Sequence, residues 1–260
     1  RPLYLQTSPE FCMKRLLAAD YPDIFSICRV FRDGECGRQH QPEFTMIEWY
    51  RRNFGLQNII DDTLELIRAA LGGRAPQAVE QHEYRQLFIS RASIDPQSAS
   101  IDELAGAAEA DKSLIRALGN ERDDWLDLIL TTCLVPTFRE DTLTVLRHYP
   151  SSQAALARTC PDDPRVADRF EVFLGTVELA NGYVELTDST EQQQRFQRDD
   201  QQRRHSNKPA RPFDLALLAA LDHGLPACAG VAMGLERLQM LHDETDDIRD
   251  VITFAFEDEG

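Results

Sequence analysis

The sequence has no apolar run that approaches the roughly 18 residues a membrane-spanning helix needs, and no signal peptide opens it. We therefore expect a protein without a membrane partner. Internal repeats and low-complexity linkers are also missing. The 260 residues are enough for one large domain with its own hydrophobic core. The chain begins at Arg1 rather than Met, so we expect further residues upstream.

Basic residues are scarce relative to acidic ones. Lys and Arg total 28 and Asp and Glu total 44, which gives a net charge of -16. Proteins that bind large polyanions usually present a basic face to the phosphates. We therefore expect no tRNA partner. Solubility alone also explains the acidity, and composition by itself favours that explanation.

The six cysteines are scattered, and none belongs to a CxxC pair. A zinc knuckle and a thioredoxin-like motif are therefore excluded. Single cysteines are typical of proteins in a reducing compartment. The sequence thus predicts a cytoplasmic protein.

Apolar periodicity and turn residues predict an irregular series of helices and strands. We expect Ser8 to cap a helix that starts at Pro9, and Gly224 to end another. Strands are expected over 24–31, 44–50, 170–174, 176–186, 231–233 and 251–256. Helices are expected over 56–71, 190–204, 213–223 and 235–242, with mainly helices within 72–150, including 101–110 and 125–134. This order favours an α+β fold with an antiparallel sheet.

Two chemical patterns lie on the first predicted hairpin. Alternation along strand 44–50 places Phe44, Met46, Glu48 and Tyr50 on one face. For a lone strand, a half-buried sheet with a polar rim is the better explanation. However, Arg32 ends the preceding strand, and an arginine beside an aromatic ring can hold a phosphate and a stacked ring together.

A third pattern consists of acids spaced by seven residues: Glu171, Glu178 and Glu185. Glu178 and Glu185 would face opposite sides of an ideal strand, so we expect a bulge or bend at Asn181 and Gly182. Acids gathered at such a bend could hold cations. A solvent-facing acidic rim is the alternative.

The segment FRDGECGRQHQPEFTMIEWY resembles motif 2 of the class II aminoacyl-tRNA synthetases, especially the lysyl branch. The resemblance implies that Arg32 contacts the α-phosphate of ATP and that Phe44 stacks on adenine. The family's adenine-contacting acid usually stands where this chain has Gly34, and here the acid is Glu35. The ATP-binding residues implied by all the motifs are Arg32, Asp33, Glu35, His40, Gln41, Phe44, Glu178, Leu179, Gly234 and Arg237.

The segment FEVFLGTVELANGYVEL is similar to the run of the lysyl synthetases that binds metal and substrate. The resemblance implies that Glu171 and Glu178 bind Mg²⁺, and that Glu185 binds the ammonium group of a lysine side chain. It also implies that Asn181 contacts the substrate. A cationic side chain needs a buried carboxylate partner, and Mg²⁺ prefers oxygen ligands.

Two further segments resemble the same family. GVAMGLER resembles motif 3, which implies that Gly234 lets the nucleotide approach and that Arg237 reaches the γ-phosphate. TSPEFCMKRLL resembles the family's N-terminal substrate segment, which implies that Glu10 binds the substrate amino group. Simple helix N-terminal charge is the alternative role of Glu10. The implied substrate-binding residues are Ser8, Pro9, Glu10, Glu48, Tyr50, Asn181 and Glu185.

The resemblance implies a class II synthetase catalytic fold, α+β with an antiparallel sheet flanked by helices, in one domain over 1–260. Residues 72–150 would form a helical, insertion-like segment. The family's motif 1, which builds its homodimer, would precede Arg1.

The particular residues within these motifs resemble the branch of the family that modifies elongation factor P rather than tRNA. That branch uses ATP and Mg²⁺ to activate lysine or (R)-β-lysine and joins it to a lysine side chain of the acceptor protein. Arg32 and Arg237 would act as the catalytic residues. A lysyl-tRNA synthetase core and a catalytically silent regulator are the alternatives. The sequence does not separate α-lysine from β-lysine.

Overall fold

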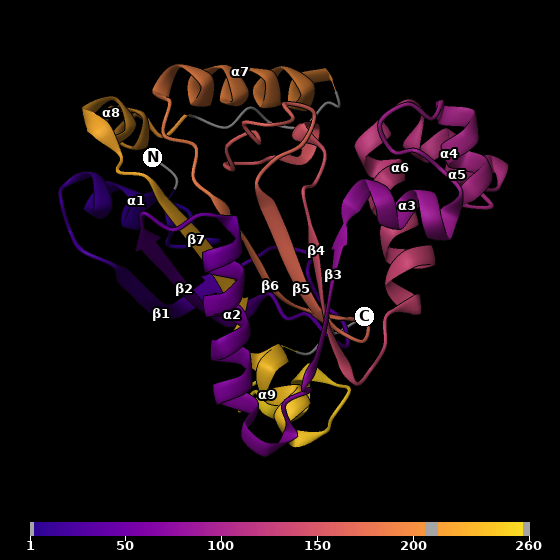
Figure 1. Ribbon diagram of the computed structural model, residues 1–260, viewed down its shortest axis with the longest axis horizontal. Coiled ribbons are helices and arrows are strands. Elements are labelled where there is room, and N and C mark those ends of the chain that lie inside the picture. Colours follow the sequence, from indigo (N-terminus) through magenta and orange to yellow (C-terminus); the bar gives the residue numbers. More distant parts are fainter. Residues whose placement is uncertain (1–2, 206–212, 257–260) are drawn as a thin grey trace.

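The computed structural model describes residues 3–205 and 213–256, which build around one sheet (Figure 1). The sheet has seven strands in the order β1-β2-β7-β6-β5-β4-β3. Neighbouring strands are antiparallel except for the parallel pair β3 and β4. The strands are β1 (Ile24–Phe31), β2 (Glu43–Arg52), β3 (Ala78–Glu83), β4 (Thr142–Arg147), β5 (Arg169–Leu174), β6 (Val177–Val184) and β7 (Cys228–Gly234). The predicted α+β class is confirmed.

Helices flank the sheet. In Figure 1, α1, α7 and α8 gather near one end, and α3 to α6 form a separate group to one side. The helices are α1 (Glu10–Ala18), α2 (Leu56–Leu71), α3 (Tyr84–Ala92), α4 (Ile101–Ala107), α5 (Lys112–Leu118), α6 (Arg122–Ile129), α7 (Ser189–His205), α8 (Leu215–Gly224) and α9 (Leu235–Asp243). Within the described residues, no helix combines the length and the apolar character needed to cross a membrane.

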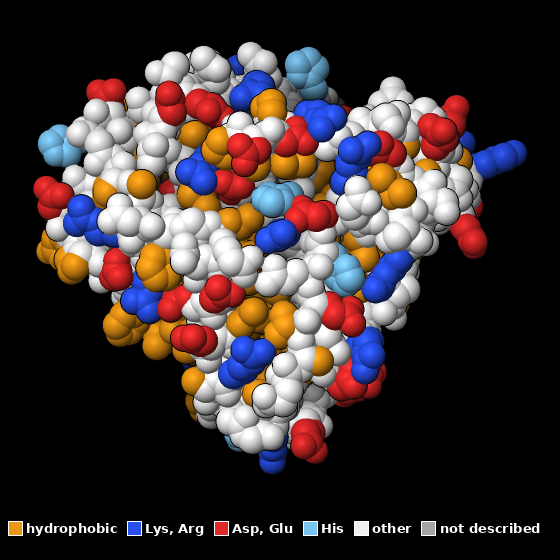
Figure 2. Space-filling view, in the orientation of Figure 1, with side chains coloured by type: hydrophobic (Ala, Val, Ile, Leu, Met, Phe, Trp, Pro, Cys, Tyr) orange, Lys and Arg blue, Asp and Glu red, His pale blue; other side chains and the backbone are white. Residues whose placement is uncertain are grey.

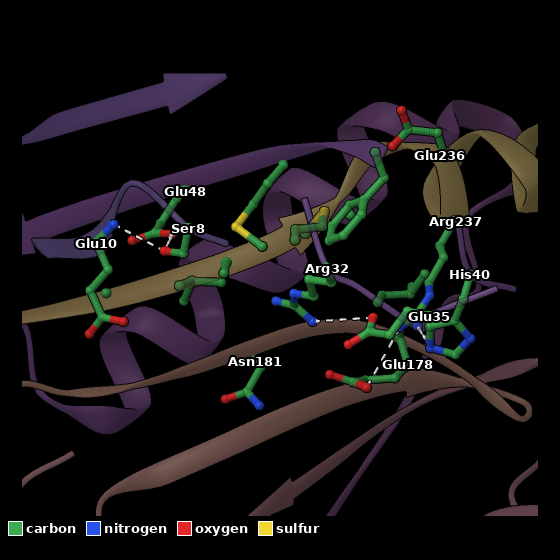
Figure 3. Close-up of a pocket in the computed structure, with 18 of the residues that line it drawn as sticks. Ser8, Glu10, Arg32, Glu35, His40, Glu48, Glu178, Asn181, Glu236 and Arg237 are labelled. Atoms are coloured by element: carbon green, nitrogen blue, oxygen red, sulfur yellow. Dashed lines mark hydrogen bonds and ion pairs between the residues drawn. The ribbon is translucent and has the colours of Figure 1, made fainter. Parts of the chain in front are cut away.

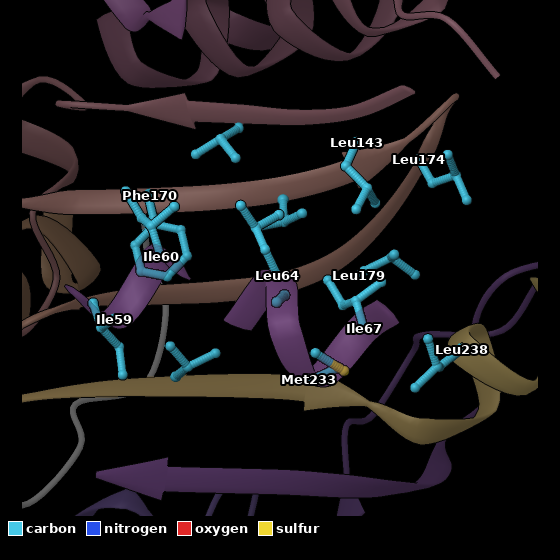
Figure 4. Close-up of a cluster of buried hydrophobic side chains, with 14 of the residues drawn as sticks. Ile59, Ile60, Leu64, Ile67, Leu143, Phe170, Leu174, Leu179, Met233 and Leu238 are labelled. Atoms are coloured by element: carbon cyan, nitrogen blue, oxygen red, sulfur yellow. The ribbon is translucent and has the colours of Figure 1, made fainter. Parts of the chain in front are cut away.

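The main core lies between α2 and one face of the sheet (Figure 4). Ile59, Ile60 and Ile67 of α2 are fully buried there against Phe170 of β5 and Met233 of β7. This core stabilises the central strands, because burying apolar side chains is the dominant favourable term in folding.

The two faces of β2 contact different parts of the molecule. Trp49 packs into the core beneath α2. Phe44, Met46, Glu48 and Tyr50 alternate onto the other face and line a cavity. The alternation predicted for this strand is therefore confirmed, and the face without α2 is left for ligand binding.

Residues 72–150 hold a second core as well as helices, with Tyr84 and Trp125 fully buried in it. The prediction missed two strands in this segment. β4 is buried along almost its whole length, so its sequence TLTVLR does not show the alternation of a half-buried strand. β3 lies at the sheet edge and is largely polar.

The predicted closing strand over 251–256 is wrong. The chain there leaves a short 3₁₀ helix (Ile248–Val251) and continues without strand pairing among the described residues. Phe254 and Phe256 are 92% and 58% exposed. β-branched and aromatic residues favour a strand only where they can pack on a neighbour, and these two do not.

Other helix and strand boundaries differ from the predicted ones by a few residues. β7 is longer than its predicted three residues because it is held between β2 and β6, and this pairing outweighs the weak strand preference of Ala229 and Gly230. α1 begins at Glu10, with Pro9 as its N-cap, while the Ser8 hydroxyl accepts a hydrogen bond from the Glu10 amide (3.0 Å). Gly224 ends α8 at φ +124° as predicted.

Candidate active site

A cavity of about 370 Å³ opens on the sheet face that α2 does not cover. Residues from the N-terminal segment, β2, β6 and β7 converge on it (Figure 3). The predicted residues that line it are Ser8, Glu10, Arg32, Glu35, His40, Gln41, Phe44, Glu48, Tyr50, Glu178, Leu179, Asn181, Glu185, Gly234 and Arg237. Pro9, Asp33 and Glu171 lie outside this lining set.

One end of the cavity, which we call the amino-acid end, centres on Glu48. Its Oε2 accepts a hydrogen bond from the Ser8 hydroxyl (2.7 Å) and its Oε1 one from the Tyr50 hydroxyl (2.6 Å). Burial, followed by the nearby charge of Glu10, raises the pKa of Glu48 to about 7. Among the described residues, the hydrogen-bond partners of Glu48 are neutral hydroxyls, and a buried carboxylate of this kind is suited to bind a ligand cation.

Glu185 is the second enclosed carboxylate of the amino-acid end. Its Oε2 lies 2.5 Å from Nζ of Lys14, and Oε1 has no hydrogen-bond partner among the described residues. Burial raises the pKa of Glu185 to about 8, although Lys14 opposes the shift. A buried acceptor without a donor is costly unless a ligand supplies one.

Gly230 on β7 makes room for this arrangement. A Cβ at that position would lie 2.4 Å from Cε1 of Tyr50 and 2.7 Å from Oε1 of Glu185. Neither distance is compatible with van der Waals contact. The missing side chain of Gly230 therefore allows the phenol and the carboxylate to approach each other.

A bulge brings Glu178 of β6 onto the cavity face. Val172 pairs with Ala180 and Phe173 with Glu178, so Leu179 is an extra residue on β6. A bulge was predicted, but its predicted place at Asn181 and Gly182 is wrong, because those residues pair regularly with β5. The extra residue changes the phase of the strand, and Glu178 and Asn181 thereby share one face.

The other end, which we call the nucleotide end, is arginine-rich. The Arg32 guanidinium lies 5.2 Å from the centre of the Phe44 ring, and Nη1 is 3.8 Å from an oxygen of Glu35. Arg237 donates to the backbone oxygen of Glu178 (2.9 Å) and contacts Nε2 of His40 (2.6 Å). Burial, and then the charge of Arg237, lower the pKa of His40. The two guanidinium groups each lie beside a carboxylate, Arg32 beside Glu35 and Arg237 beside Glu178 (3.6 Å), and their donors are suited to phosphate.

The two predicted magnesium ligands differ in availability. Glu178 lines the cavity, and its pKa is raised by burial and by the charge of Glu171. A cation between them would relieve that repulsion. Glu171 already accepts from Tyr149 (2.6 Å), Arg169 (2.6 Å) and Asn181 (3.0 Å). A carboxylate has about four acceptor positions, so Glu178 fits a metal better, and the magnesium site stays a prediction.

The whole chain matches one protein family. Residues 1–258 match the sequence profile of the class II tRNA synthetases of the D, K and N group. The chain belongs to this family. This family membership agrees with the strand order of the sheet and with the convergence of the four sequence segments on one cavity.

Two relatives with known names align with nearly the full length of this chain. It is 44% identical over 254 residues to the elongation factor P–(R)-β-lysine ligase of Salmonella typhi, which covers 97% of this chain and 77% of the relative. It is 43% identical over 257 residues to the protein of the same name from Sodalis glossinidius, covering 98% and 78%. The family predicted from the motifs, and its branch, are therefore supported along nearly the full sequence.

Sequence reasoning missed several residues of this synthetase site. Tyr183 lines the cavity and donates a hydrogen bond to Glu10. Its place two residues from both Asn181 and Glu185 would have indicated this, because strand residues alternate. Lys14 lies one helical turn after Glu10, a spacing at which side chains meet. The role of Gly230 depends on three-dimensional contacts, and local sequence carries no signal for it.

Proposed function

We propose that the chain is an ATP-dependent ligase that activates (R)-β-lysine or lysine and transfers it to the ε-amine of a lysine on elongation factor P. One observation carries the proposal: a single cavity joins two enclosed carboxylates, Glu48 and Glu185, to a cluster that contains Arg32 and Arg237. The first pair suits an ammonium group, and the second suits the phosphates of ATP. The relatives' names supply the acceptor.

In the first step, a carboxylate oxygen of the amino acid attacks the α-phosphorus of ATP. The bond from that phosphorus to the bridging oxygen breaks, and pyrophosphate leaves with its electron pair. Arg32 and Arg237 stabilise the charge that develops on the phosphate oxygens. Glu48 and Glu185 hold the ammonium end so that the carboxylate faces the nucleotide.

Mg²⁺ supplies further neutralisation of phosphate charge when it is bound. Glu178 would be its main protein ligand, with the remaining acceptor position of Glu171 as the second. The raised pKa of Glu178 supports this assignment, since a carboxylate next to another carboxylate gains from a shared cation.

In the second step, the neutral ε-amine of the acceptor lysine attacks the carbonyl carbon of the aminoacyl-adenylate. The mixed anhydride bond breaks, AMP leaves, and the nitrogen loses a proton to solvent as the amide forms. None of the described residues is assigned as a general base for this step. A protein acceptor agrees with the net charge of -16. On the face in Figure 2, acidic and basic side chains are interspersed.

The homodimer implied by the synthetase family is part of the proposal. Light scattering coupled to gel filtration measures it directly. A monomer at micromolar concentration would contradict the dimer and leave the assignment of the cavity unchanged.

ATP–pyrophosphate exchange is the experiment that tests the function. Exchange supported by lysine and most strongly by (R)-β-lysine is the expected result. Radiolabelled amino acid should then appear on purified elongation factor P and not on lysine tRNA. Label on tRNA alone would replace the proposal with a lysyl-tRNA synthetase, and no exchange with any amino acid would indicate a silent regulator.

A further inference from the structure

Lys14 is a buried cation at the amino-acid end, and the two proposed steps do not use it. Its side chain is 2% exposed and extends from α1. Nζ lies 2.7 Å from Oε1 of Glu10 and 2.5 Å from Oε2 of Glu185. It also lies 5.5 Å from the centre of the Tyr183 ring. Lys14 is not among the residues that line the cavity, so it contacts these carboxylates from the side that faces away from the cavity.

The charges around the amino-acid end do not balance. The carboxylates that interact there are Glu10, Glu48 and Glu185, and among the described residues Lys14 is the cation that interacts with all three. The other charged or titratable groups are the phenols of Tyr50 and Tyr183, the thiol of Cys228 and, near that thiol, the guanidinium of Arg52. Burial favours the neutral forms of these phenols and of the thiol. With all three carboxylates ionised, two negative charges remain without an internal partner.

We propose that Lys14 is a positioning residue that sets the charge specificity of the cavity for diamino acids. Its ammonium holds Glu10 and Glu185 in place and neutralises one of the three carboxylates. The two remaining charges match a substrate that carries two ammonium groups and delivers its carboxylate to the arginine cluster. This inference deepens the proposed function and depends on it for the identity of the substrate.

Proton release on binding follows from this arrangement. Without substrate, the raised pKa values of Glu48 (about 7) and Glu185 (about 8) mean that Glu185 is largely protonated and Glu48 partly protonated near neutral pH. The two substrate ammonium groups take the place of those protons. Affinity for a diamino acid should therefore rise from pH 6 to pH 8. Without Lys14, Glu10 and Glu185 lose their cation, and the rise should move to higher pH.

Three variants of Lys14 test the inference. Lys14→Met removes the charge at similar length, Lys14→Gln keeps a hydrogen-bond donor, and Lys14→Ala leaves a space. Lys112→Met is the matched control, because Lys112 is an exposed lysine at the start of α5. Circular dichroism and thermal melting establish that each variant is folded.

Isothermal titration with lysine and with (R)-β-lysine gives affinity without turnover. We expect Kd to rise on the order of 10–100-fold in Lys14→Met and Lys14→Gln, because removing one member of a buried ion pair leaves an uncompensated charge. The KM for ATP should not change. The pH at which affinity rises should increase in both variants, and Lys112→Met should match the wild type.

Chemical rescue distinguishes a local role of the Lys14 ammonium group from a general role of Lys14 in folding. n-Propylamine, an alkylammonium that matches the three carbons and the nitrogen removed in Lys14→Ala, should restore binding to that variant. n-Propanol, which has the same length without the charge, should not. If Lys14→Ala is unfolded, the pH profile of Lys14→Gln decides the question.

Unchanged affinity and an unchanged pH profile in folded variants would overturn the inference while the proposed function stands. Loss of affinity without a pH shift and without rescue would also overturn it, by assigning Lys14 to structure alone, and so would unfolding of all three variants. A wild-type protein that binds no diamino acid would instead refute the proposed function, and the inference with it.

Discussion

The two ends of the cavity differ in how far they are formed before any ligand binds. At the amino-acid end, both oxygens of Glu48 already accept hydrogen bonds, and Tyr50 is 2% exposed. At the nucleotide end, the Arg32 side chain is 40% exposed and its guanidinium covers the Phe44 ring. In the synthetase family, that ring is where adenine is expected to stack. The amino-acid end is thus preorganised, whereas we expect the more exposed Arg32 to change its contacts when a nucleotide binds.

This difference has a physical origin. Carboxylates buried under a sheet are costly unless hydroxyls or cations hold them, so the amino-acid end is fixed by the same contacts that allow it to fold. Arg32, whose side chain is 40% exposed, carries little such cost and can exchange Glu35 for phosphate. Arg237 is 19% exposed and is held by Glu178 and His40. We therefore expect substitutions at the nucleotide end to affect turnover, and those at the amino-acid end to affect affinity.

The largest effect is expected from Arg237→Ala. Arg237 contacts the Glu178 backbone and His40, and under the proposed function it would stabilise the charge on the leaving pyrophosphate. Loss of such a group lowers turnover on the order of 1000-fold. ATP–pyrophosphate exchange at saturating lysine measures it. Arg165→Ala, at an exposed arginine paired with Asp163 (2.7 Å), is the control. An exchange rate within twofold of wild type would refute the catalytic role of Arg237.

The second-largest effect is expected from Glu185→Gln, on the KM for the amino acid. The amide keeps the shape of the side chain but cannot neutralise an ammonium, so the KM for the amino acid should rise on the order of 100-fold. kcat and the KM for ATP should change little. Exchange kinetics with each substrate varied in turn separate these parameters. Glu65→Gln, at an exposed position of α2, is the control. A fall in kcat at unchanged KM would contradict the division between the two ends.

A smaller effect is expected from pH on stability. Glu48 and Glu185 have folded-state pKa values of about 7 and about 8, above the 4.5 expected for an unfolded chain. The folded protein therefore binds more protons between pH 5 and pH 8, so its stability falls as pH rises through that window. We expect the melting temperature of the ligand-free protein to drop by roughly 5 °C.

Added lysine should oppose that loss, and most strongly at pH 8, where its ammonium replaces the missing protons. Differential scanning calorimetry with and without lysine measures both effects. Glu48→Gln should flatten part of the pH dependence. A melting temperature that rises from pH 5 to pH 8 in the wild type, with no greater protection by lysine at pH 8, would show that these carboxylates ionise normally.

Sequence predicts the residues that line both ends better than it predicts the residues that support them. Local motifs located Arg32, Phe44 and Arg237, because their roles depend on short, ordered segments that the synthetase family shares. Lys14 and Gly230 act through contacts with Glu185 and Tyr50 across the sheet, which no single segment encodes. The same reason explains the misplaced bulge: Leu179 is the extra residue only because of how β6 pairs with β5.

Errors in the fold have a related cause. The segment 251–256 has strand-forming residues but no strand to pair with among those described, and β4 has buried residues on both faces. Periodicity detects a half-buried strand with one polar face. It fails where a strand is fully covered, and where a suitable segment finds no neighbour.

The smallest effect is expected from Glu35→Gln. In the synthetase family the acid of this loop stands at the position of Gly34, whose φ of +79° suits glycine. Glu35 takes its place nearby, but it is 40% exposed and 3.8 Å from Arg32. Exposed ion pairs contribute little, so the KM for ATP should rise by only about two- to fivefold.

The control for Glu35→Gln lies at the other end of the same loop. Glu43 is 55% exposed and lies 3.6 Å from Arg29, so Glu43→Gln removes a similar ion pair outside the cavity lining. It should leave the KM for ATP unchanged. If Glu35→Gln raised the KM for lysine instead of the KM for ATP, the loop would belong to the amino-acid end. The contrast between the preorganised amino-acid end and the more exposed nucleotide end would then be wrong, because an exposed loop residue would control affinity at the enclosed site.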